Sequence, residues 1–201
     1  MKTSDLFVKC LENEGIEYIF GVPGEENADF LMSLHESKKI KFILTRHEQG
    51  AAFMAESYGK LTGKLSCCLS TLGPGATNLL TGVADANMDH SPVLVITGQG
   101  SSDRLHKESH QIMDVCHMFK SVTKWTTSVR NPATIPEIIR KAVRLATLEK
   151  PGAVHIELPE DIARLDVKAK PLKSFPYRRS IAEDNIIYLS LIHISEPTRR
   201  E

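Results

Sequence analysis

The chain has 201 residues, and its 25 Lys and Arg side chains balance 25 Asp and Glu side chains, so its formal net charge is zero. A chain without excess positive charge has no general electrostatic means of binding a nucleic-acid backbone or an anionic membrane surface. The composition is 41% hydrophobic and 25% charged, which is typical of a globular domain and excludes disorder on composition alone.

The first fifteen residues carry Asp5, Glu12 and Glu14 at positions where a signal peptide would need an apolar stretch. No run of about 18 apolar residues predicts a membrane span. These observations predict a cytoplasmic protein without a membrane partner. The four cysteines form no C-x-x-C pair, so we expect free thiols packed as small hydrophobic side chains.

Short apolar runs alternate with helical patterns from the first residue onward. Ser4 is expected to cap a first helix, and Gly15 to close it. Further helices are predicted around Phe30 to Leu34 and at 48–61, 76–87, 113–119 and 134–149. Strands are predicted at 18–20, 41–44, 65–70, 93–97, 122–129 and 154–158. This alternation predicts an α/β fold, with an open, mostly parallel sheet of about six strands and helices on both faces.

Three turns follow the first three predicted strands, at 21–24 (GVPG), 45–48 (TRHE) and 71–75 (TLGPG). In an open parallel sheet, ligands bind at the edge formed by the carboxyl ends of the strands. Glycine allows a close approach of the backbone, and the amides that begin the helix after the third turn favour an acceptor atom. None of these turns fits a Walker A loop or a dinucleotide fingerprint. We therefore expect a ligand site of another kind at this edge.

Glu48 is the first candidate for a chemical role, and two interpretations of it stay open. A carboxylate in a first helical turn commonly compensates the helix dipole. A carboxylate at a ligand-binding edge can instead share or donate a proton. The neighbouring sequence, small and apolar from Gly50 to Ala55, is compatible with both interpretations.

The sequence resembles the pyrimidine-binding domain of the thiamine-diphosphate enzymes over residues 1–166. Within that superfamily it is most similar to the acetolactate synthase large subunits. The motifs that carry the resemblance keep the family's order and spacing: 21–24 (GVPG), 46–55 (RHEQGAAFMA), 73–79 (GPGATNL) and 96–99 (ITGQ). The resemblance implies a thiamine-diphosphate-binding fold of the pyrimidine-domain type.

The resemblance also implies roles for individual residues. Glu48 would be catalytic, through a hydrogen bond to a ring nitrogen of the cofactor's aminopyrimidine that promotes loss of the thiazolium proton. Gln111 would be the second catalytic residue, close to cofactor and substrate. The implied cofactor-binding residues are Pro23, Gly24, Glu48, Thr71, Gly73, Pro74, Gly75 and Asn78. No residue of this chain is implied as a metal ligand.

The implied activity is that of a carboligase or decarboxylase acting on pyruvate or a related 2-keto acid, with two pyruvates giving 2-acetolactate and CO2. Pyruvate oxidase, another 2-keto acid decarboxylase of the superfamily and a non-catalytic α/β interaction domain remain alternatives. The pair His110-Gln111 resembles the catabolic acetolactate synthases, whereas the biosynthetic enzymes usually carry Phe-Gln. A bound flavin (FAD) is therefore left open.

The family's active site forms between two subunits. The resemblance implies that the diphosphate-binding domain of a partner subunit completes the site in a homodimer or homotetramer. That domain holds Mg2+ through a Gly-Asp-Gly motif, which does not occur in these 201 residues. The chain by itself is expected to form half a site and to be inactive.

Three segments are predicted along the chain. Residues 1–166 form the pyrimidine-binding domain, and the basic, proline-containing residues 167–188 form a linker toward a central domain. Residues 189–201 are predicted to be an artefact, because 189–199 (LSLIHISEPTR) resembles a translated adapter oligonucleotide from sequencing-library preparation. The alternative is a genuine final strand, since Leu189, Leu191 and Ile194 are apolar.

Overall fold

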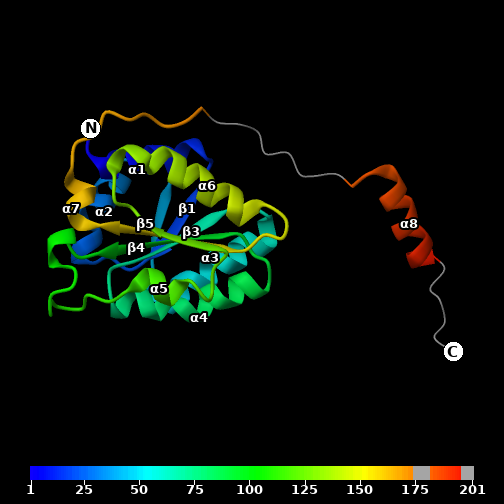
Figure 1. Cartoon of the computed structure of the whole chain (residues 1–201), viewed down its shortest axis with the longest axis horizontal. Coiled ribbons are helices and arrows are strands. Elements are labelled where there is room, and N and C mark those ends of the chain that lie inside the picture. The colour runs from blue at the N-terminus through cyan, green and yellow to red at the C-terminus, as the bar shows by residue number, and fades with distance from the viewer. Residues whose placement is uncertain (174–181, 196–201) are drawn as a thin grey trace.

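The computed structural model describes residues 1–173 and 182–195. Within these ranges, one sheet contains β1 (Tyr18–Gly21), β2 (Lys41–Leu44), β3 (Ser66–Ser70), β4 (Val93–Gln99), β5 (Trp125–Ser128) and β6 (Ala153–Pro159). The strand order is β2-β1-β3-β4-β6-β5, and every neighbouring pair is parallel (Figure 1). The predicted α/β fold with an open parallel sheet is confirmed.

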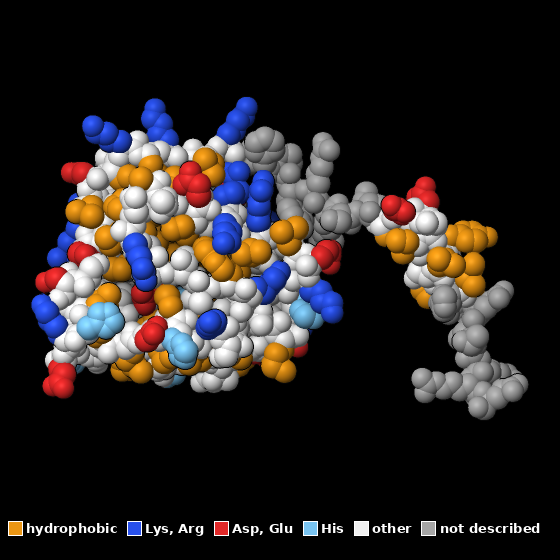
Figure 2. All heavy atoms as spheres, viewed as in Figure 1, with side chains coloured by type: hydrophobic (Ala, Val, Ile, Leu, Met, Phe, Trp, Pro, Cys, Tyr) orange, Lys and Arg blue, Asp and Glu red, His pale blue; other side chains and the backbone are white. Residues whose placement is uncertain are grey.

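Helices cover both faces of the sheet, as predicted (Figure 1). One layer consists of α1 (Thr3–Asn13), α2 (Ala28–His35), α6 (Ile135–Thr147) and α7 (Glu160–Arg164). The other layer consists of α3 (Glu48–Thr62), α4 (Pro74–Met88) and α5 (Val115–Phe119). On the face drawn in Figure 2, acidic and basic side chains are interspersed with apolar ones, in keeping with the zero net charge.

The two helical layers bury separate cores on the two faces of the sheet. Cys67 and Leu69 of β3 face the layer of α1 and α6, whereas Cys68 between them faces the layer of α3 and α4. A strand covered on both faces needs apolar side chains at successive positions, which is why continuous apolar runs mark these strands in the sequence. The cysteines are free thiols, and Cys10, Cys67 and Cys68 are buried as predicted, while Cys116 is half-buried.

Several predicted boundaries are wrong by a few residues. Ser4 does not cap α1: it is buried inside the first turn, and the Asp5 carboxylate accepts the backbone N–H of Lys2 (3.2 Å). Pro74 begins α4 two residues earlier than expected, because the first helical position needs no N–H partner and tolerates proline. The strand predicted at 122–129 contracts to the four residues of β5.

Two α-helices within the described residues were not predicted. α7 follows β6 directly, with Glu160 and Asp161 in its first turn, where acidic side chains favour a helix N-terminus. α8 (Asp184–Ser195) covers the end of the predicted linker and part of the predicted artefact, so the alternative of a final strand is wrong. The remaining parts of those segments, 174–181 and 196–201, lie outside the described residues. No helix in the described ranges combines the length and apolar character that crossing a bilayer requires.

Residues 165–173, which we call the strap, run along α1 without helix or strand. At its beginning, the backbone N–H and the hydroxyl of Thr3 both donate to the carbonyl of Leu165 (2.8 and 2.7 Å). At its end, the Arg140 guanidinium of α6 donates to the carbonyl of Lys173 (2.8 Å). The strap therefore links α1 to α6 through hydrogen bonds.

A histidine is buried in β6, the strand next to the edge strand β5. His155 of β6 is fully buried, with its two ring nitrogens 2.9 Å from the hydroxyl of Thr97 and 2.6 Å from that of Thr126. Its ring stacks on Phe119 at 4.2 Å between centroids. Burial lowers the pKa of His155 to about 3, because the charged imidazolium would lose its hydration.

This burial predicts a pH-dependent stability. The unfolded chain takes up a proton on His155 near pH 6.5, but the folded chain does so only near pH 3, so the free energy of unfolding should fall as the pH drops between these values. Each pH unit costs about 1.4 kcal/mol for one such group. Urea unfolding at pH 7.5 and 4.5 should show a smaller pH-dependent loss in His155→Gln than in the unmodified chain. Equal losses in both proteins would contradict the prediction.

Candidate cofactor site

The turns that follow β1 and β3 are in direct contact at the carboxyl edge of the sheet. A Cβ added to Gly24 would lie 2.4 Å from the Cβ of Thr71, so only glycine allows this approach. The Thr71 hydroxyl donates to the Glu26 carboxylate (2.7 Å), and the Gly24 N–H donates to the side-chain oxygen of Asn27 (2.9 Å). These two hydrogen bonds give the turn after β1 a fixed shape.

Glu48 reaches the same edge from the start of α3. The helix begins there because Nδ1 of His47, the N-cap, accepts the N–H of Gln49 (3.2 Å). The Glu48 side chain is half-buried, and its Oε2 accepts the side-chain amide of Asn78 from α4 (3.0 Å). A Cβ on Gly75 would lie 3.3 Å from Oε1, so the other carboxylate oxygen faces the beginning of α4.

Thr71 lies between the two acidic side chains. Its hydroxyl is bonded to Glu26, while its methyl group would be 3.0 Å from a Cβ on Gly75, which in turn faces Glu48. Glu48, Thr71, Gly75 and Asn78 therefore form one group of side chains and backbone, which we call the pocket cluster. Side chains from two helices and one turn meet here because their parallel strands end at the same edge.

The segment that carries Gln111 lies against the turn after β3. A Cβ on Gly73 would lie 2.3 Å from the backbone oxygen of Gln111, and the Gln111 side chain is exposed. Gln99 at the end of β4 holds this segment, because its side-chain amide donates to the carbonyl of Met113 (2.9 Å) and to the Glu157 carboxylate (3.0 Å). Burial raises the pKa of Glu157.

The remaining predicted residues are also at this edge. Pro23 is exposed in the turn after β1, and Pro74 is exposed at the first position of α4. Sequence analysis missed Glu26 and Asn27 as structural parts of the turn. A signal was present for Asn27, since polar side chains directly after a Pro-Gly turn commonly bond to its backbone, whereas Glu26 bonds the distant Thr71 side chain and carried no such signal.

Large apolar side chains are exposed on β2 and α3. Leu44 at the carboxyl end of β2 is 68% exposed, and Phe53 and Met54 of α3 are 36% and 48% exposed. The sequence analysis did not single out these positions. Among the described residues, no group of three or more His, Cys, Asp or Glu side chains is placed to hold a metal ion.

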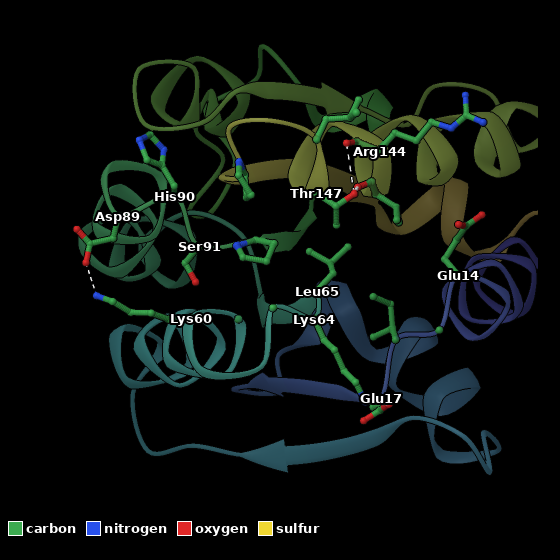
Figure 3. A pocket seen from close by; sticks show the side chains of 18 of the residues that line it. Glu14, Glu17, Lys60, Lys64, Leu65, Asp89, His90, Ser91, Arg144 and Thr147 are labelled. Carbon is green, nitrogen blue, oxygen red and sulfur yellow. Dashed lines mark hydrogen bonds and ion pairs between the residues drawn. The ribbon is translucent and has the colours of Figure 1, made fainter. Parts of the chain in front are cut away.

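A cavity of about 810 Å³ lies at the opposite edge, where the strands begin (Figure 3). Its apolar wall includes Ile16, Leu65 and Pro92, and its rim carries charged side chains. Most of those charges are paired: Lys60 with Asp89, Lys64 with Glu17 (2.7 Å) and Arg140 with Glu14 (2.5 Å). None of the sequence-predicted site residues lines this cavity, so we separate it from the candidate cofactor site.

The profile described as "Thiamine pyrophosphate enzyme, N-terminal TPP binding domain" matches residues 1–118, more than half of the chain. The chain belongs to this family. Thiamine pyrophosphate is the same compound as thiamine diphosphate. All four residues of the pocket cluster fall within the matched residues.

Several known proteins from different organisms are similar in sequence to this family member. It is 40% identical over 174 residues to the "Probable acetolactate synthase large subunit" of Methanocaldococcus jannaschii, covering 86% of this chain and 29% of the relative. It is 41% identical over 164 residues to the "Acetolactate synthase large subunit" of Lactococcus lactis, covering 82% of this chain and 28% of the relative. The "Acetolactate synthase, chloroplastic" of Arabidopsis thaliana is 39% identical over 161 residues, covering 80% of this chain and 24% of the relative. The chain thus spans less than a third of the length of these relatives.

Proposed function

We propose that residues 1–166 are the pyrimidine-binding domain of a thiamine-diphosphate-dependent acetolactate synthase, which forms 2-acetolactate and CO2 from two pyruvates. The observation that carries the proposal is the Glu48 carboxylate, held by Asn78 at the edge where the family's motifs converge. The relatives that bear this name support the choice of reaction. Glu48 and Gln111 would be the catalytic residues.

The residues present at this edge fit the pyrimidine half of the cofactor. Glu48 offers a half-buried carboxylate oxygen that can share a proton with a ring nitrogen. The side-chain nitrogen of Asn27 is buried and has no acceptor within the described part of the chain, which leaves one unpaired donor in the turn after β1. When bound, the cofactor's thiazolium ring supplies the electron sink for loss of CO2 from a 2-keto acid.

The contribution of the chain is binding, orientation and proton transfer. Glu48 would hold a proton at the pyrimidine ring, and Asn78 would keep the carboxylate oriented. Thr71 donates its own proton to Glu26, so only its lone pairs remain for a ligand. The exposed Leu44 of β2 and Met54 of α3 suit an interface, and we propose that a partner's diphosphate-binding domain covers them.

The rest of the proposal concerns the assembled protein. A homodimer or homotetramer would place Mg2+ on the partner's diphosphate-binding domain, and FAD, if present, on a part of the relatives that this chain does not span. We propose a cytoplasmic location, in keeping with four cysteines that form no disulfide.

Titration of the isotope-labelled chain with thiamine diphosphate and Mg2+ tests the site. Amide shifts should be confined to the turns after β1 and β3 and to the start of α3, with a dissociation constant of about 1 mM or weaker, because half of the site is absent. No acetolactate should form from pyruvate. Micromolar affinity would contradict the half-site, and shifts centred on the cavity at Lys60 and Lys64 would contradict the location.

A further inference from the structure

Glu26 is a half-buried residue that contacts three elements of the candidate cofactor site. Its carboxylate accepts the hydroxyl of Thr71 at 2.7 Å, which joins the turn after β1 to the turn after β3. Its backbone is fixed as well, because Gly98 of β4 lies against it: a Cβ on Gly98 would be 3.1 to 3.2 Å from Glu26 backbone and Cβ atoms. The Glu26 side chain is only partly exposed to solvent. Its neighbours therefore limit how far its carboxylate can move away from Thr71.

The Thr71 Cβ carries a hydroxyl, a methyl group and a hydrogen, and a turn of about 120° in χ1 moves all three to new staggered positions. In the structure the hydroxyl faces Glu26, and the methyl group faces Gly75. The hydrogen bond to Glu26 favours this rotamer, because in the other two a methyl group or a hydrogen would take the place of the hydroxyl and leave a carboxylate oxygen without its donor.

We propose that Glu26 is a positioning residue, which fixes the Thr71 rotamer and keeps the Thr71 hydroxyl away from Glu48. In the rotamer that turns the hydroxyl into the present place of the methyl group, the hydroxyl would lie on the Gly75 side, which is the side of Glu48 Oε1. There it would compete for the carboxylate oxygen that the cofactor's ring nitrogen needs. Glu26 thus acts through Thr71 and does not touch the ligand itself. This inference rests on the proposed function of the site.

The rotamer can be measured without any ligand. Three-bond couplings from the Thr71 methyl carbon to the backbone nitrogen and carbonyl carbon report its χ1 angle in the full 201-residue chain. We expect a single rotamer in the unmodified chain and in Glu26→Gln, whose amide oxygen still accepts a hydrogen bond. Glu26→Ala should give averaged couplings. The matched control is Glu25→Ala, an exposed carboxylate one residue away, which should leave the couplings unchanged.

Titration with thiamine diphosphate completes the test. Glu26→Ala should weaken binding about three- to tenfold, and Glu26→Gln should restore it, because loss of one oriented hydrogen-bonding group has an effect of this size. A purely structural role would lower the urea midpoint in Glu26→Ala while the affinity stayed the same. Equal affinity loss in the Ala and Gln variants, a single Thr71 rotamer in Glu26→Ala, or averaged couplings in the unmodified chain would each overturn the proposal.

The two proposals fail in different ways. If thiamine diphosphate shifts no resonance of residues 71–78 in any variant, the proposed cofactor site is wrong, whatever the couplings show. If it shifts them equally in all variants, the cofactor site stands and the positioning role of Glu26 is wrong.

Discussion

Glu48→Gln is expected to lower acetolactate formation by about 10²- to 10⁴-fold, the range usual for removal of a group that shares or transfers a proton. The substitution keeps the shape of the side chain, and its amide oxygen can still accept the Asn78 hydrogen bond. It removes the acid that, in the proposed role, would hold a proton at the pyrimidine ring. Binding of the cofactor should weaken far less than the rate, because the steric fit is unchanged.

The measurement requires a complete active site. Residues 1–166 of this chain would replace the corresponding part of the Lactococcus lactis relative, which the chain matches at 41% identity. Acetolactate formation from pyruvate and the exchange of the cofactor's C2 hydrogen with deuterated solvent are then compared among variants. Glu36→Gln, an exposed carboxylate after α2, serves as the control and should retain activity. Full activity of Glu48→Gln would refute the role of this carboxyl group.

Gly73→Ala is expected to destabilise the isolated chain by about 2 to 4 kcal/mol, through two separate causes. Gly73 has φ of +51°, a conformation that L side chains rarely adopt. Its added methyl group would also meet the backbone oxygen of Gln111 at 2.3 Å. Because backbone cannot swing aside as a flexible side chain does, the segment carrying Gln111 must move or the turn must open.

Gly63→Ala is the matched control for this variant. Gly63 has φ of +67°, but no atom lies within 4 Å of the added Cβ, so only backbone strain is introduced. It should cost about 1 to 2 kcal/mol. Urea unfolding gives both values, and tryptic cleavage at Arg104 and Lys107 reports on the Gln111 segment. Equal destabilisation in the two variants, with equal cleavage rates, would show that the contact with Gln111 is absent.

The sheet and the candidate site were predictable to different degrees. Strands covered on both faces carry uninterrupted apolar runs, so β3 and β4 are visible in the sequence, and the turns after them are marked by Gly and Pro. Parallel strands bring such turns to one edge, which is why the eight predicted cofactor residues lie close together. Their chemical roles came from the family resemblance and stay predictions.

Individual side-chain partners were not predictable. The Thr71–Glu26 hydrogen bond joins residues 45 apart and the Gln99–Glu157 bond residues 58 apart. Such pairs depend on strand order and register, and the apolar pattern of a strand is the same whichever neighbour it has. Ser4 failed as a cap for a related reason: residues with cap-forming side chains also pack inside helices when tertiary contacts bury them.

The strap makes the order of synthesis matter for folding. α1 leaves the ribosome first, yet it packs on α6 and α7, and its first turn is bonded to a carbonyl 162 residues further along the chain. Contacts between such distant parts of a chain close large loops and form late. α2, which packs on α1 through Phe7 and Phe30, is made early, but the part of α1 that α6 and α7 cover must stay uncovered until almost all of the domain has been made. In a cell, this helix is the natural first target for a chaperone that protects the nascent chain from aggregation.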